Sequence, residues 1–202
     1  MWATQSRNEN RAARTAPRPS TTFGSGTEQA MVDFGEGEVP ARRHRNADRS
    51  LGGWVADTAH ADHESHIAEN VVVFGNARVF GACRLLDQVR VYDYARIADG
   101  AIVSGFAEVS GSASVSDASI AERSVVTGHA RVQGAIVRGE AWVIDRASVT
   151  KGALVQDQAL VRGQAFVTDQ ATVTGQAVVD GTVRGDVLVL DGHIGQSERV
   201  ES

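Results

Sequence analysis

The chain has 202 residues, a formal net charge of −5 and a single cysteine, Cys83. The net negative charge is not typical of nucleic-acid binding, no apolar run approaches the roughly 18 residues of a membrane-spanning helix, and one cysteine excludes both an intrachain disulfide and a cysteine-cluster metal site. Aromatic residues make up only 5% of the sequence, which is too few for an ordinary globular core.

Residues 1–50 predict a mostly irregular, polar N-terminal arm. This stretch holds eight arginines against six acidic residues and shows no sustained hydrophobic periodicity, which is typical of a flexible extension. An alternative is that the arm binds a protein partner and becomes ordered when it does. The first twenty residues lack the apolar segment of a secretory signal, so we expect a cytoplasmic or virion-associated protein.

A repeat begins at residue 71 and continues to residue 181. Each unit reads small–x–aliphatic–x–Gly/Asp–x, as in the segments ARVFGA, ALVQDQ and ATVTGQ. Alternation with period two places the small and aliphatic residues on one side of a short strand, and Gly or Asp tolerates the dihedral angles of a tight corner. Seventeen of the nineteen aliphatic residues from Val73 to Val179 have Gly or Asp two positions later, so the pattern is not due to chance.

A strand and a corner every six residues leave no room for a returning hairpin strand. We therefore expect an all-β fold, a single-chain parallel β-helix of about seven triangular coils, each with three strands and about 18 residues. This domain spans residues 51–202, with regular coils over 71–181 and a C-terminal cap strand and tail over 182–202. Two units are one residue short, from Val115 to Ile120 and from Val132 to Val137, and we expect both on the same corner of adjacent coils.

The hexad pattern resembles that of the left-handed parallel β-helices of hexapeptide-repeat proteins. The segments LGGWV (51–55) and GNARVFG (75–81) are similar to the YdcK-like family of bacterial and phage proteins, whose members are often labelled acetyltransferases. Asp33-Phe34-Gly35 corresponds to a DFG-like segment that precedes LGGW in that family. The resemblance implies a left-handed coil, a homotrimer and, for an enzyme, acetyl-coenzyme A as the acyl donor.

The resemblance also implies which residue would act in an acyltransferase. Such enzymes use a histidine as general base at a cleft between subunits, and His129 is the only histidine inside the regular coils. No interval of the register from Val73 to Val179 exceeds six residues, however, so no long loop interrupts the coils to shape an acceptor pocket. We therefore expect no cofactor and no catalysis, with an acyltransferase that uses His129 as the alternative.

The remaining nucleophilic and metal-ligating side chains predict no site. His60, His63 and His66 follow one another at intervals of three, but the six-residue register runs through them and scatters them around a corner. Cys83 occupies an inward position that other coils fill with alanine, which indicates a buried side chain without a chemical role. We expect no metal.

Outward side chains distinguish the three faces of the expected solenoid. One face carries a continuous apolar column through its later coils, centred on Trp142, whereas the second is largely polar. Such a strip on a soluble solenoid usually marks a contact surface, so we expect this face to pack around a threefold axis. The expected interface residues are Phe74, Tyr92, Val125, Trp142, Ile144, Leu160 and Val178.

The sequence favours a structural or interaction protein over an enzyme. A rigid, uninterrupted body suits the presentation of surfaces, and similar repeats occur in phages, so we expect a homotrimeric, noncatalytic β-solenoid that acts as a phage-encoded or virion-associated assembly component. A third hypothesis, binding of a sugar or polymer, depends only on Trp142 and Tyr92. Ion pairs between coils are expected to add little stability. They would join Arg90 to Glu108 and Lys151 to Asp169.

Overall fold

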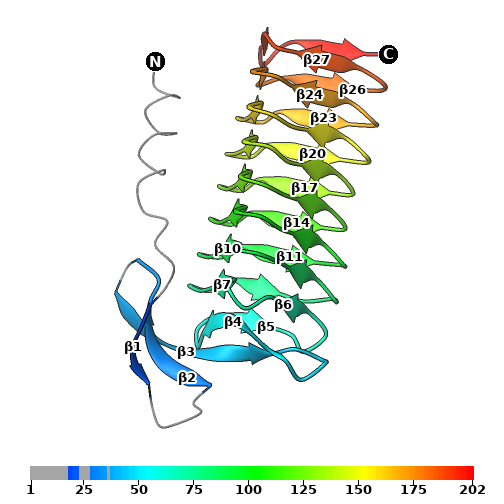
Figure 1. Cartoon of the computed structure of the whole chain (residues 1–202). Coiled ribbons are helices and arrows are strands. Elements are labelled where there is room, and N and C mark those ends of the chain that lie inside the picture. The colour runs from blue at the N-terminus through cyan, green and yellow to red at the C-terminus, as the bar shows by residue number, and fades with distance from the viewer. Residues whose placement is uncertain (1–17, 23–27, 36) are drawn as a thin grey trace.

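The computed structural model describes residues 18–22, 28–35 and 37–202, the first of these ranges as a backbone only. All regular elements of these residues are β-strands, and most are two or three residues long. Figure 1 shows that they stack into a rod in which successive coils lie one above the other, with a small group of strands beside its lower end. The fold is an all-β parallel β-solenoid of about eight turns.

Three sheets form the sides of the rod, and from β4 onward each strand pairs in parallel with the equivalent strands of the neighbouring coils. The first, twelve-stranded sheet contains β1 (Arg18–Thr22), β2 (Gln29–Asp33), β3 (Glu38–Arg45), β4 (Leu51–Ala56), β7 (Val72–Val73), β10 (Arg90–Val91), β13 (Glu108–Val109), β16 (Val125–Val126), β19 (Trp142–Val143), β22 (Leu160–Val161), β25 (Val178–Val179) and β28 (His193–Ile194). The second, nine-stranded sheet contains β5 (His60–Ala61), β8 (Arg78–Val79), β11 (Arg96–Ala98), β14 (Ser114–Ser116), β17 (Arg131–Gln133), β20 (Ser148–Thr150), β23 (Phe166–Thr168), β26 (Thr182–Arg184) and β29 (Arg199–Glu201). The third, eight-stranded sheet contains β6 (His66–Ile67), β9 (Arg84–Leu85), β12 (Ile102–Val103), β15 (Ser119–Ile120), β18 (Ile136–Val137), β21 (Leu154–Val155), β24 (Thr172–Thr174) and β27 (Leu188–Leu190).

The register confirms the vertical neighbours that the repeat predicts. Trp142 pairs with Leu160 in the first sheet, and every aliphatic residue of the register from Val73 to Val179 is fully buried. The two short units both fall on the corner between the second and third sheets, in adjacent coils, because β14 pairs with β17 and β15 pairs with β18. The core is therefore a narrow column of stacked aliphatic and small side chains.

The corners are joined by hydrogen bonds between coils. Asp93 and Asp145 stand at corners with positive φ, a conformation that aspartate tolerates because its short side chain can bond locally. The carboxylate of Asp93 accepts a hydrogen bond from the N–H of Gly111 at 2.9 Å, and that of Asp145 from Gly163 at 3.0 Å. The Gly/Asp pattern thus specifies contacts between coils as well as the turns themselves.

The solenoid is longer at both ends than the regular hexads indicate, which accounts for about eight turns where the sequence indicates about seven. Residues 51–67 already wind as a first coil through β4, β5 and β6. Residues 182–201 form β26 to β29 where the sequence suggests a single cap strand and a tail. These last coils are shorter than 18 residues, since Val178 pairs with His193, but they keep an inward aliphatic residue such as Val183.

The described part of the N-terminal arm contains regular structure that the sequence does not indicate. β2 and β3 form an antiparallel hairpin, and β3 pairs with β4, so that the hairpin extends the first sheet below the first coil. Ala30, Val32 and Phe34 alternate with exposed or partly exposed residues and are buried. A period-two pattern of three residues is too short to distinguish from chance in the sequence. Residues 1–17 of the arm lie outside the described residues.

The two glycines of the LGGW segment let the chain enter the first coil. A Cβ at Gly52 would collide with the carbonyl oxygen of Ile67, and a Cβ at Gly53 would collide with that of Val71. Glycine is the residue that permits this approach of two backbones. Trp54 follows them and is buried at the base of the rod. The segment is therefore explained by packing at the entry to the solenoid.

Two buried side chains near the end of β3, those of His44 and Asn46, cover the lower edge of the third sheet. The Asn46 side chain accepts a hydrogen bond from the N–H of Ile67 at 2.9 Å and donates one to the carbonyl oxygen of the same residue at 3.2 Å, as a neighbouring strand would. His44 donates from Nε2 to the carbonyl oxygen of Ser65 at 3.0 Å. Backbone groups of β6 at the open end of the sheet are thereby satisfied.

We expect this anchoring of the hairpin to weaken in mild acid. Burial lowers the pKa of His44 from its ordinary value, and smaller effects of both signs come from Ser65, Asp62, Arg42 and His66. Because the unfolded chain binds a proton near pH 6.5 that the folded chain resists, stability is lost as the pH falls from about 6.5 toward the pKa of the folded state. The melting temperature should therefore decrease between about pH 7.5 and about pH 5.5.

Replacing His44 with glutamine removes this contribution, so the decrease in melting temperature over that pH interval becomes smaller by a few degrees. His63, which is exposed at the neighbouring corner, provides the matched control, and its replacement with glutamine should leave the decrease unchanged. Thermal unfolding of the three chains at both pH values measures the difference. An identical decrease in the His44→Gln chain and the unsubstituted chain would show that the buried imidazole does not contribute.

Candidate functional site

The first sheet carries an apolar column on its outward side, as the sequence predicts. Val125, Trp142, Leu160 and Val178 stand in register on four successive coils, and Ile144 projects from the same side two residues after Trp142. We call these five residues the Trp142 column. Val125 and Leu160 are buried, whereas the other three are partly exposed. Paired side chains on one side of a sheet are about 5 Å apart, so the members of the column pack on one another.

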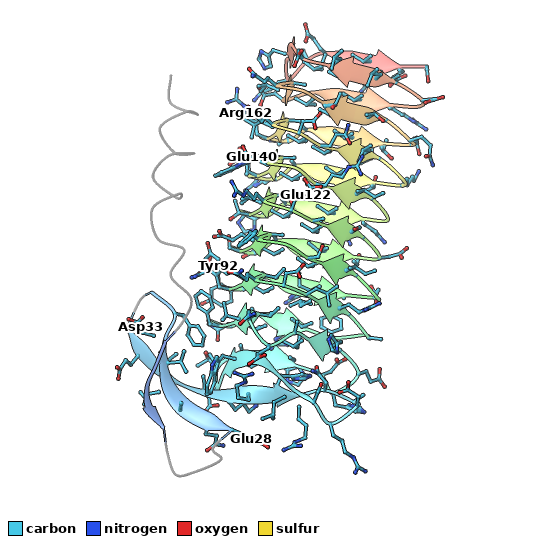
Figure 2. All side chains as sticks on the ribbon, viewed as in Figure 1. Glu28, Asp33, Tyr92, Glu122, Glu140 and Arg162 are labelled. Atoms are coloured by element: carbon cyan, nitrogen blue, oxygen red, sulfur yellow. The ribbon has the colours of Figure 1, made fainter. Side chains whose placement is uncertain are left out.

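The lower part of the same face is covered by the N-terminal hairpin. The ring of Phe34 stacks on that of Phe74, and Phe74 stacks on Tyr92, with ring centroids 4.9 Å apart in both pairs. Arg90 holds the hairpin in place, because its Nη2 donates to the carbonyl oxygen of Phe34 at 2.9 Å. Figure 2 shows Tyr92 on the side of the rod that faces the hairpin. Two of the expected interface residues, Phe74 and Tyr92, are thus engaged within the chain.

The prediction of an ion pair between Arg90 and Glu108 is wrong, although the two residues are neighbours in the register. Arg90 turns to the backbone of Phe34, and Glu108 accepts a hydrogen bond from the hydroxyl of Tyr92. Burial, together with this bond to Glu108, raises the pKa of Tyr92 far above its usual range. The hairpin therefore redirects the polar side chains that the repeat alone would pair.

The ion pair expected between Lys151 and Asp169 is confirmed, with 3.4 Å between Nζ and Oδ1. Asp169 also pairs with Nε of Arg184 at 2.9 Å. One carboxylate thus links three successive coils at the corner that follows the second sheet. Pairs this close to the solvent contribute little to stability.

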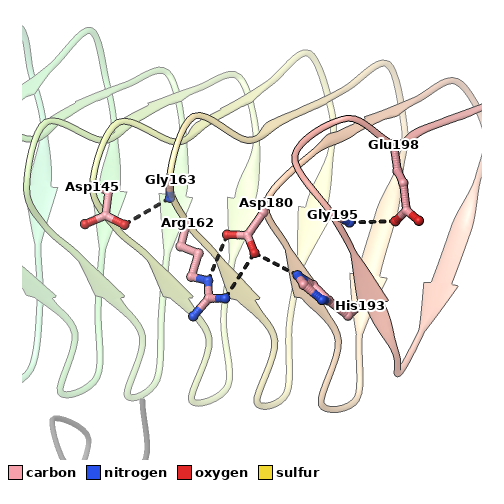
Figure 3. Close-up of polar contacts among 7 residues, drawn as sticks. All are labelled: Asp145, Arg162, Gly163, Asp180, His193, Gly195 and Glu198. Carbon is pink, nitrogen blue, oxygen red and sulfur yellow. Dashed lines mark hydrogen bonds and ion pairs between the residues drawn. The ribbon is translucent and has the colours of Figure 1, made fainter. Parts of the chain in front are cut away.

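A polar network that the hexad pattern does not predict lies beside the upper part of the Trp142 column. Arg162 donates from Nε and Nη2 to the two carboxylate oxygens of Asp180, at 2.8 and 3.0 Å, and Nε2 of His193 lies 2.7 Å from Oδ2 of the same carboxylate (Figure 3). The hydrogen bond from Arg162 is the main cause that holds the pKa of Asp180 below its usual range. His193 follows Val178 in the outward column, so the network closes the column at its upper end.

A histidine oriented by a carboxylate is the arrangement that activates an imidazole for acid–base chemistry. Here the carboxylate of Asp180 is already paired with Arg162 through both oxygens, and His193 is exposed on the outer side of a sheet. A shallow polar concavity near this end of the rod is lined by corner residues such as Asp157, Gly175 and Asp191 and lies on a different corner. The geometry therefore supports a role of the network in holding the last coils together.

His129 stands at the corner after β16 and is exposed. Its backbone N–H donates to the carbonyl oxygen of Asp145, whose carboxylate accepts from Gly163. A general base needs an orienting partner and an enclosed acceptor. Among the described residues, neither is found beside the His129 ring.

The histidines at 60, 63 and 66 and the single cysteine lie where the register predicts. His60 is on β5, His63 on the corner and His66 on β6, so the three belong to two sheets and a turn. In the described ranges, no three His, Cys, Asp or Glu side chains come together as a possible metal site. Cys83 is fully buried, and burial raises the pKa of its thiol.

In comparisons with known proteins, no protein-family model, no curated protein and no solved structure matches the chain. Across the part of the chain that the structure describes, no helix has the length and apolarity to cross a membrane. The observations that bear on function are therefore the solenoid itself, the Trp142 column and the hairpin that covers Phe74.

Proposed function

We propose that this protein is a noncatalytic structural β-solenoid that assembles with copies of itself through the Trp142 column. The observation that carries the proposal is the column: apolar side chains in register on successive coils of one sheet, with Trp142 partly exposed at its centre. A contiguous apolar strip on a soluble protein marks a contact surface. A ladder with one step per coil also matches the ladder of a second copy in spacing.

Three copies around an axis parallel to the rod is the arrangement we favour. An aromatic side chain at the centre is typical of the core of such an interface. The hairpin over Phe74 occupies the lower coils, so the contact runs along the upper ones. A rigid trimeric rod suits an assembly component, and we propose a phage-encoded or virion-associated one, located in the cytoplasm or the virion, whose N-terminal arm binds a protein partner.

Replacing Trp142 with glutamate tests the assembly. The carboxylate would have to be desolvated at the centre of the contact, so we expect association to weaken at least about 30-fold, the loss typical of a central aromatic residue. Sedimentation velocity should show an assembly of three chains, or of a multiple of three, for the unsubstituted chain and a smaller species for the variant. Circular dichroism should be unchanged, because the side chain is outward and partly exposed.

Phe166→Glu is the matched control for this experiment. Phe166 is an outward aromatic residue on the second sheet, 39% exposed, and its replacement should leave the sedimenting mass unchanged. If Trp142→Glu sediments like the unsubstituted chain, the column is not the interface and the proposal is overturned.

The alternative is an acyltransferase, as the resemblance to the YdcK-like hexapeptide-repeat family implies, with a left-handed coil, acetyl-coenzyme A and His129 as general base at a subunit boundary. Its support is that His129 is exposed at a corner that borders the first sheet. Addition of coenzyme A separates the two proposals. A raised melting temperature that His129→Ala leaves in place would indicate an acyl-donor site, whereas the assembly proposal expects no shift.

A further inference from the structure

The third sheet presents a second apolar surface, apart from the Trp142 column. We call the outward side of β12, β15, β18 and β21 the Ile136 face, and its main residues are Ile102, Ser119, Ala121, Ile136, Arg138 and Leu154. Ile102 is 39% and Ile136 44% exposed. Arg138 is the only charged residue at the outward positions of these four strands. Depletion of charge around exposed aliphatic side chains is typical of the centre of a protein interface.

A small side chain at Ser119 interrupts the column of large aliphatic side chains on this face. Ile102, Ser119 and Ile136 follow one another on successive coils. Ala121 lies two residues after Ser119, and Arg138 occupies the equivalent position in the next coil. The result is a row of projections, spaced like the coils at about 4.8 Å, with a gap at Ser119 and Ala121. A projecting side chain on a surface with the same spacing would fill this gap, and a second copy of the chain has such a surface.

A twofold axis along the strand direction, midway between β15 and β18, brings the two rows into register. This rotation reverses the rod but keeps the direction of the strands, so β15 of one copy faces β18 of the other, and β12 faces β21. Ile136 then enters the gap at Ser119 of the second copy, and Ile102 meets Leu154. Each contact occurs twice, as an isologous interface requires.

The same rotation pairs the charges. Arg138 comes opposite Ala121 of the second copy, whose small side chain leaves room for the guanidinium group. Glu122 follows Ala121 at the corner and is exposed, so its carboxylate lies next to the incoming Arg138. Within its own chain, Arg138 donates to Oε1 of Gln156 at 3.0 and 2.7 Å, which orients the guanidinium group along the face. The one charge on the face therefore meets an opposite charge in the twofold contact.

We propose that the Ile136 face binds a second copy of this chain in an antiparallel, twofold contact. The proposal deepens the assembly function and rests on it, but it uses a different face from the Trp142 column. A threefold axis parallel to the rods and a twofold axis perpendicular to them together build assemblies of six chains or more.

Four chains tested by sedimentation velocity over a range of concentrations separate the two contacts: the unsubstituted chain, Trp142→Glu, Ile136→Glu and the double variant. We expect Trp142→Glu to form dimers, Ile136→Glu to form trimers and the double variant to be monomeric. In the Trp142→Glu background, Ile136→Glu should weaken the dimer at least about 30-fold. Phe166→Glu, with similar exposure on the second sheet, should leave that dimer intact.

Charge reversal tests the register of the contact. In the Trp142→Glu background, Arg138→Glu should weaken the dimer and addition of Glu122→Arg should restore it. A dimer that persists in Ile136→Glu, or a Trp142→Glu chain that is monomeric at all concentrations, would overturn the Ile136 contact. Failure of the Glu122→Arg rescue would overturn the antiparallel register. If instead Ile136→Glu alone yields monomers, the trimer proposal fails while the twofold contact stands.

Discussion

Replacing Gly139 with alanine is expected to lower the free energy of unfolding by about 3 kcal/mol or more, because two effects add. Gly139 has a φ of +75°, in the left-handed region, where a Cβ costs about 1–2 kcal/mol. The added Cβ would also lie 2.6 Å from the backbone nitrogen of Asp157 in the next coil. That backbone belongs to the corner stacked above and cannot move aside as a flexible side chain would. Equilibrium unfolding in urea measures the loss.

Gly100→Ala is the matched control for this prediction. Gly100 has nearly the same φ, +72°, but nothing lies within 4 Å of the position that its Cβ would take. We expect this substitution to cost only about 1 kcal/mol, the cost of the conformation alone. Equal losses at the two sites would mean that the conformation of the turn selects glycine at Gly139 and that the stacking of corners does not.

The stacking of corners also explains why so much of this fold can be predicted from sequence. A solenoid repeats one local environment, so each inward position from Val73 to Val179 repeats the same requirement for an aliphatic residue. A single departure from the pattern, such as Glu122 in place of Gly or Asp, does not obscure it. The pairing of Trp142 with Leu160 follows from counting alone. The length of the repeat thus predicts which residues of neighbouring coils are in contact, whereas most other folds offer no such rule for long-range contacts.

Prediction fails where the period ends. The hairpin contacts the rod through Phe34 and Arg90, which are 56 residues apart in the chain, and no repeat relates them. Asp180 and His193 are brought together because the coil that links them is shorter than 18 residues, so counting by hexads places other residues beside His193. The buried side chain of His44 is found only from the structure for the same reason.

The candidate site divides in the same way. The Trp142 column can be read from the repeat, because outward residues stack as regularly as inward ones. The engagement of Phe74 and Tyr92 within the chain cannot, because it depends on Phe34, which stacks on Phe74, while Phe74 in turn stacks on Tyr92. The exposure of Ile136 likewise appears only when each face is compared with the segments that pack on it.

Replacing Phe34 with alanine is therefore expected to release the hairpin while the rod stays folded. The Phe34 side chain is buried at the end of an aromatic stack, and a buried phenylalanine replaced by alanine typically loses about 3–5 kcal/mol. The loss is expected to be local, because the ring stacks on Phe74, which follows β7 near the lower end of the rod. Hydrogen exchange should become faster in β2 and β3 and stay unchanged in the strands from β13 to β25.

The matched control is Phe80→Ala, because Phe80 lies six residues after Phe74 and is 40% exposed, so its removal should leave exchange in the hairpin as it is. Release of the hairpin would also uncover Phe74 and Tyr92 below the Trp142 column. Glu108 separates these rings from the column, but the exposed apolar area of this face increases, and we expect the Phe34→Ala chain to associate more strongly than the unsubstituted chain. Slow exchange that persists in β2 and β3 of Phe34→Ala would show that strand pairing with β4 holds the hairpin without the aromatic stack.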